Sequence, residues 1–184
     1  MGQIEKGLNY LKSIPFILKI IEFIVLLIAF ALAGHFMNEA VTNFFATFGK
    51  KGNIEFFLFA TIVGWLIAIV LPILFFIGIQ EKVSAIPWTL VVAILSAVWA
   101  VLLIIASSLL AAAAKHYEDK EGIRGKSVCE LLDDANEDSQ CGQLIGGTIL
   151  GFIATVLYAV DTIIHARMFM TGASSPQAGG AVPA

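Results

Sequence analysis

The sequence predicts an all-α membrane protein built as a bundle of four transmembrane helices. Hydrophobic residues make up 59% of the 184 residues and charged residues only 14%, and the mean hydropathy is +0.90. A soluble domain of this size needs a charged shell to meet water, and so few charges cannot supply one. The apolar runs are also long and continuous, which favours spanning helices over the alternating strands of a membrane barrel.

Four apolar segments are long enough to cross a hydrocarbon layer about 30 Å thick, which takes about 20 helical residues. They define a transmembrane domain at 14–169, in which the second and third segments contain no Asp, Glu, Lys or Arg. The predicted helices lie at about 14–33, 56–79, 83–114 and 144–168. Outside these helices we predict an N-terminal segment at 1–13, outer loops at 34–55 and 115–143, and a disordered tail at 170–184.

The cysteines indicate which side of the membrane the loops face. An even number of spans puts both termini on one side, and the distribution of Lys and Arg does not say which. The only two cysteines, Cys129 and Cys141, both lie in the second outer loop. Such a pair suits a disulfide in an oxidising compartment, the alternative being two unrelated thiols. We therefore expect cytoplasmic termini and loops that face outside.

The first outer loop contains apolar residues at helical spacing. They predict an amphipathic helix that lies on the outer leaflet or caps the bundle. The alternative is an extension of the first helix that packs on the other outer loop. The predicted outer amphipathic face consists of Phe36, Val41, Phe44, Phe45 and Phe48.

Ionisable residues inside the predicted helices are costly in lipid and are therefore functional candidates. Lys19 in the first helix and Asp161 in the fourth lie at similar depths, so they pair if these helices are neighbours. Glu22 follows Lys19 by one turn, and His165 follows Asp161 by one turn. The cluster is interpreted either as a polar clasp that fixes helix pairing or as a proton or ion relay. We favour the clasp, because no polar residues continue the route across the membrane.

Small residues recur every four positions along the last two helices. Such rows let helix backbones approach closely in lipid, either within one bundle or between copies. We expect the intramolecular use. The row on the fourth helix consists of Gly147, Gly151, Thr155 and Ala159, and the third helix carries a similar row of Ser96, Ala100, Ser108 and Ala112.

Several function classes are disfavoured by the sequence. A net charge of -3 offers no basic face for nucleic acid. The sequence also has no Gly-x-Ser-x-Gly, His-Glu-x-x-His or phosphate-binding Gly-rich motif. We therefore expect a protein that is not an enzyme, with no catalytic residues and no metal site. The alternative function is a small ion or proton channel or transporter, or an auxiliary subunit of one.

Two stretches resemble the MARVEL-domain family of four-span membrane proteins, which includes the myelin-and-lymphocyte protein, plasmolipin and the singles-bar-type proteins. The first is the first span with its approach, YLKSIPFILKIIEFIVLLIAFALA from Tyr10 to Ala33. The second is GTILGFIATVLYAVD, from Gly147 to Asp161 in the fourth span. The resemblance covers about residues 8 to 170.

This resemblance implies a left-handed antiparallel four-helix bundle with cytoplasmic termini, no catalytic residues and no cofactor. It also implies work at specialised membranes, in vesicle trafficking, membrane apposition, cell junctions or cell fusion. The expected location is the plasma membrane, vesicles or both. The expected partners are membrane lipids, further copies of the chain or other membrane proteins. The outer aromatic face and the disulfide loop are expected to contact lipid headgroups or an opposing membrane surface.

Overall fold

The computed structural model describes residues 11–39, 49–83, 86–120, 125–135 and 140–173. Four helices of this part are long and apolar enough to cross a membrane. They are α2 (Ile14–Glu39), α4 (Lys51–Ile77), α6 (Trp88–Asp119) and α8 (Gln140–Ala173), and two short helices, α5 (Ile79–Lys82) and α7 (Val128–Ala135), lie between them. No strand occurs within the described ranges. The predicted all-α fold with four membrane-spanning helices is confirmed.

All four ends of the long helices at the α7 end lie beyond the predicted boundaries. The predicted loop at 34–55 is too long, because α2 continues to Glu39 and α4 begins at Lys51. Likewise, α6 continues to Asp119 and α8 begins at Gln140, so the predicted loop at 115–143 is also too long. Hydropathy marks only the part of a helix that lies in hydrocarbon. Polar residues at its end leave the membrane without stopping the helix.

Two predicted helix boundaries are wrong for a local backbone reason. The second helix ends at Ile77 rather than at 79, because Gly78 adopts the left-handed conformation with φ 79° and donates its N–H to the last turn. The third helix begins at Trp88 rather than at 83. Pro87 directly precedes it, and a proline disfavours helical geometry in the residue before it.

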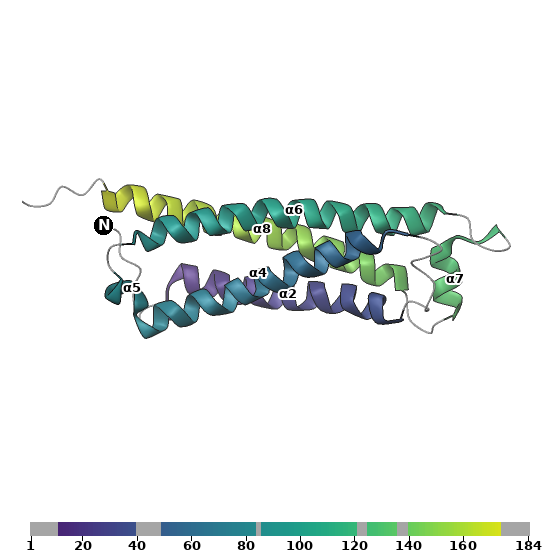
Figure 1. The fold of residues 1–184 in the computed structure, drawn as a ribbon, viewed down its shortest axis with the longest axis horizontal. Helices are drawn as coiled ribbons and strands as arrows, with labels where there is room; N and C mark the ends of the chain where they lie inside the picture. Colours follow the sequence, from purple (N-terminus) through teal and green to yellow (C-terminus); the bar gives the residue numbers. More distant parts are fainter. Residues whose placement is uncertain (1–10, 40–48, 84–85, 121–124, 136–139, 174–184) are drawn as a thin grey trace, which may run out of the picture.

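The four long helices lie side by side and run alternately up and down (Figure 1). In chain order each packs against the next, and α8 packs back against α2, so the bundle closes into a ring. The end that carries α5 is where α2 begins and α8 ends, whereas α7 lies at the opposite end (Figure 1). The first and last helices are therefore neighbours, as the predicted pairing of Lys19 with Asp161 requires.

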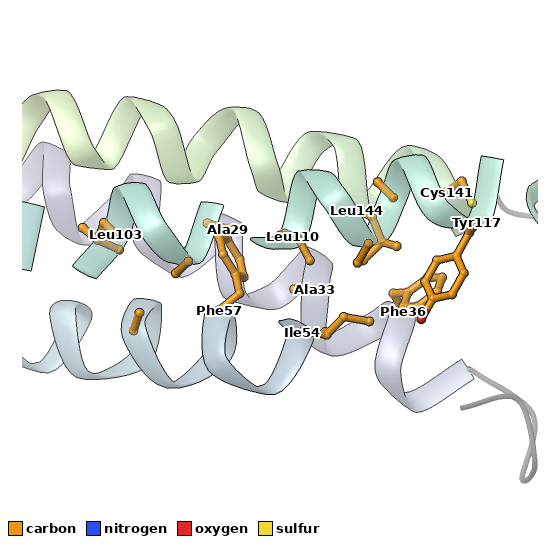
Figure 2. Packing of buried hydrophobic residues seen from close by; sticks show 14 of the residues in the cluster. Ala29, Ala33, Phe36, Ile54, Phe57, Leu103, Leu110, Tyr117, Cys141 and Leu144 are labelled. Atoms are coloured by element: carbon orange, nitrogen blue, oxygen red, sulfur yellow. The ribbon is translucent and has the colours of Figure 1, made fainter. Parts of the chain in front are cut away.

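Apolar side chains fill the interior of the bundle. Figure 2 shows them as a column between the helices, from Leu103 through Phe57 and Leu110 to Tyr117. About one third (33%) of the most apolar stretch of each long helix is buried in this way. The remaining surface presents residues such as Ile24 and Val156, which are 48% and 62% exposed. A surface of this kind is solvated by lipid chains rather than by water.

Phe36 does not lie on an outer amphipathic face. It is 1% exposed and stacks on the ring of Tyr117, with 6.0 Å between the ring centroids. Ala33 and Ala29 are buried one and two turns before it, so the inward face of α2 continues into the segment expected to be loop. For Phe36 the alternative interpretation, an extended first helix, is correct. Val41, Phe44, Phe45 and Phe48 lie outside the described residues.

The predicted disulfide is present between α7 and α8. Cys129 in α7 and Cys141 in the first turn of α8 are bonded, with their Cα atoms 5.6 Å apart. A capping box begins α7, because Ser127 Oγ accepts the N–H of Glu130 and the Glu130 carboxylate accepts the N–H of Ser127. The disulfide thus fastens a short, self-capped helix to the end of the bundle.

Candidate functional site

Lys19 lies in the interior of the bundle and is 2% exposed. Its Nζ is 2.7 Å from Glu22 Oε2 on the same helix and 3.0 Å from Asp161 Oδ2 on α8. The ammonium group also lies over the ring of Tyr158, 4.7 Å from the centroid. The Lys19 ammonium therefore contacts two carboxylates and an aromatic ring, and all of these groups are buried inside the bundle.

Asp161 joins this group to two further side chains. Its Oδ2 accepts a hydrogen bond of 2.5 Å from Ser96 Oγ on α6. His165 Nδ1 lies 3.0 Å from the backbone carbonyl of Asp161 and 3.1 Å from its Oδ1. Asp161 is fully buried and His165 is 2% exposed. We call the set Lys19, Glu22, Ser96, Asp161 and His165 the buried charged cluster.

The structure brings together all four ionisable residues that the sequence identified, and it adds Ser96 and Tyr158. In the sequence Ser96 was notable only as a small residue, because its position opposite Asp161 depends on how α6 and α8 pack. Tyr158 precedes Asp161 by one turn, and its hydroxyl donates to the Gly64 carbonyl of α4 at 2.7 Å. Through these side chains the cluster connects α2, α6 and α8, and Tyr158 extends the connection to α4.

The geometry makes the buried charged cluster a strong tie between helices. Removing one partner of a buried ion pair leaves a charge without compensation, which costs about 3–5 kcal/mol. Here one ammonium group contacts both Glu22 and Asp161. The second oxygen of Glu22, Oε1, is buried and accepts no hydrogen bond from the described residues. Lys19 is therefore the residue on which the cluster depends most.

Toward the α7 end the cluster is followed by apolar core. Leu26, Leu103 and Ala29 are fully buried there. Buried threonines along the bundle direct their hydroxyls to their own helices, as Thr61 does to the Phe57 carbonyl and Thr148 to the Leu144 carbonyl. Within the described ranges, polar side chains do not form a continuous route from the cluster to the α7 end.

The row of small residues on α8 faces the interior only at its first two members. Gly147 and Gly151 are buried, Thr155 donates its hydroxyl to the Gly151 carbonyl, and Ala159 is exposed. Because a helix turns about 100° per residue, a four-residue step drifts by about 40° and the row winds onto the surface. The intramolecular interpretation holds for the two glycines, whereas Ala159 faces the exterior.

The predicted row on the third helix is wrong for the same reason. Ser96 is buried and Ala100 is partly buried, but Ser108 and Ala112 are exposed. The close approach uses Ser107 instead. A Cβ atom on Gly151 would lie 2.3 Å from Ser107 Oγ and 2.7 Å from the ring of Phe57. Gly151 is therefore the position where α8 needs the absence of a side chain.

A second close packing site involves residues that the sequence did not single out. Trp99 donates its indole N–H to the Ala60 carbonyl of α4 at 3.0 Å. A Cβ atom on Gly64 would lie 2.7 Å from that indole nitrogen. Gly64 thus makes room for the Trp99 ring and also offers its carbonyl to Tyr158. Isolated glycines of this kind carry no periodic signal, so only the packing reveals them.

Within the described part of the chain, no group of three His, Cys, Asp or Glu side chains is arranged to hold a metal ion. The cluster, the packed glycines and the apolar exterior together define an integral membrane protein with a four-helix bundle. The chain belongs to the MARVEL family, because the model of that membrane-associating domain matches residues 10–164. Searches of curated proteins and of solved structures gave no match.

Proposed function

We propose that this protein is a non-enzymatic membrane protein that organises specialised membrane patches in vesicle trafficking, membrane apposition, cell junctions or cell fusion. The observation that carries the proposal is the closed buried charged cluster. Its charged side chains on α2 and α8 contact one another, Ser96 of α6 donates a hydrogen bond to Asp161, and apolar core follows toward the α7 end. A cluster of this form supports a clasp that holds the bundle in one shape while its apolar exterior contacts lipids and other membrane proteins.

The Asp161→Asn variant tests this role in reconstituted vesicles. A clasp loses stability or delivery to its membrane while proton and ion flux stay at the level of empty vesicles. A relay loses a flux that the wild-type protein possesses, while the protein folds normally. A proton or ion flux through wild-type protein above that of empty vesicles would overturn the proposal and favour a channel or transporter.

We also propose that both termini are cytoplasmic and that the disulfide loop faces the exterior or a vesicle lumen. The Cys129–Cys141 bond supports this orientation, because disulfides persist in oxidising compartments. In intact cells, reduction followed by an impermeant thiol reagent is expected to label both cysteines from outside. Labelling after permeabilisation of the plasma membrane alone, which admits the reagent to the cytosol but not to vesicle lumens, would contradict the orientation.

A further inference from the structure

A groove of about 340 Å³ opens on the bundle surface between α6 and α8, at the end that carries α7. Its floor is made of small side chains, with Ala114 and Thr148 each 8% exposed. On the α8 side it is lined by the more exposed Ile145 and Ile149, at 48% and 56%. The lining residues are Ala111, Ala114, Lys115, Glu118 and Asp119 of α6 and Ile145, Thr148 and Ile149 of α8.

The groove crosses the boundary between hydrocarbon and headgroups. From Trp88 to Ala114, α6 has no charged residue, so Lys115 is the first charge on this helix. Ala111 lies one turn deeper, about 6 Å toward the membrane centre. The lining is therefore apolar on the membrane side and charged on the outer side. This polarity matches the division of a phospholipid into acyl chain and headgroup.

The charges at the outer end favour one class of headgroup. Lys115 offers one positive charge, and Glu118 and Asp119 offer two negative charges, all on exposed side chains. The rim thus carries a net charge of -1, which disfavours an anionic lipid. A headgroup with both a phosphate and an ammonium group meets charges of both signs, since Lys115 faces the phosphate and the two carboxylates face the ammonium.

We propose that this groove binds one phospholipid with a zwitterionic headgroup in the leaflet next to α7, with an acyl chain between Ala111 of α6 and Ile145 and Ile149 of α8. The proposal deepens the proposed function, because a lipid held by the bundle gives it a preference for particular membrane patches. Its link to membrane patches rests on the proposed function, whereas lipid binding itself rests on the membrane-embedded fold. Its test is a binding measurement in purified lipid, whereas the proposed function is tested by flux and by delivery in cells.

The test uses full-length protein in nanodiscs that contain a photoreactive phosphatidylcholine, with labelled peptides identified by mass spectrometry. We expect labelling to concentrate on 111–119 and 145–149. An equal amount of photoreactive phosphatidylglycerol with the same acyl chains is expected to label these peptides several-fold less. Soluble phosphocholine is expected not to compete, because it lacks the acyl chain that the groove holds.

The matched variants are Ala111→Phe and Ala112→Phe. The first fills the groove and is expected to reduce labelling there at least fivefold. The second places the same ring on an exposed neighbouring position that does not line the groove, and is expected to leave labelling unchanged. Lys115→Gln removes the cation expected to meet the phosphate and is expected to reduce labelling by phosphatidylcholine. A monodisperse size-exclusion profile and an unchanged helical circular dichroism spectrum check that each variant is folded.

Three results would overturn the proposal. Labelling spread evenly over the lipid-facing sides of all four long helices would indicate ordinary annular lipid. Equal labelling by phosphatidylglycerol would remove the argument from charge. Wild-type labelling in a folded Ala111→Phe variant would mean that the groove does not hold the lipid. None of these results bears on flux or on delivery to membranes, so the proposed function would stand or fall separately.

Discussion

Replacing Lys19 by Met tests the dependence of the bundle on the ammonium group of the buried charged cluster. Methionine keeps an apolar side chain of similar length and removes the charge that lies 2.7 Å from Glu22 and 3.0 Å from Asp161. At an effective dielectric constant near 20, each contact corresponds to a gross attraction of about 6 kcal/mol. Desolvation offsets much of this, and breaking a buried pair from one side costs about 3–5 kcal/mol net.

The Asp161→Asn variant provides the comparison for the loss of stability expected of Lys19→Met. After that replacement Lys19 still contacts Glu22, and the asparagine side-chain oxygen still accepts hydrogen bonds from Ser96 and Lys19. The expected loss is therefore that of weakened hydrogen bonds, about 1 kcal/mol. Lys126→Gln is the matched control, because Lys126 pairs with Asp134 on an exposed surface and its replacement is expected to have no measurable effect.

The assay is equilibrium unfolding of the full-length protein in mixed micelles with increasing SDS, followed by tryptophan fluorescence. The triple variant Lys19→Met, Glu22→Gln, Asp161→Asn removes the cation and both carboxylates together. It is expected to regain most of the stability that Lys19→Met loses. The reasoning is refuted if Lys19→Met is no less stable than Asp161→Asn, or if the triple variant is less stable than Lys19→Met alone.

The remaining predictions concern packing, cross-linking and one hydrogen bond, all measured in the same unfolding assay. Gly151→Ala is expected to lower the free energy of unfolding by at least 2 kcal/mol, because the new Cβ overpacks against Ser107. Gly146→Ala is the control: its Cβ meets only the end of a leucine side chain at 3.1 Å and should cost under 1 kcal/mol. Equal losses would contradict the packing argument. Replacing Cys129 and Cys141 by Ser is expected to lower the free energy of unfolding by about 3 kcal/mol. In non-reducing electrophoresis the wild-type protein is expected to run as a monomer. A disulfide-linked dimer would contradict the intramolecular bond. Tyr158→Phe is expected to lose about 1 kcal/mol with the hydrogen bond to Gly64, and an unchanged midpoint would mean that the hydroxyl contributes nothing.

The cluster was predictable from the sequence to an unusual degree. A charged side chain in an apolar span must find a partner, and few ionisable residues were present at the depth of Lys19. Asp161 was therefore identified before the helix order was known, and the structure places the two 3.0 Å apart. Ser96 and Tyr158 were not identified as members, because hydroxyl groups occur throughout membrane helices and reveal no partner by themselves.

The sequence alone determined the fold class, the number of spanning helices, the disulfide and the main charged partners. Each follows from a solvation requirement: apolar runs must leave water, buried charges must be compensated, and a lone cysteine pair suits an oxidising environment. Only the tertiary structure decided which small residues face inward, that Phe36 packs on Tyr117, and that a groove forms beside Lys115. These features depend on the rotation of each helix about its axis, which is set by packing against its neighbours and leaves little trace in hydropathy.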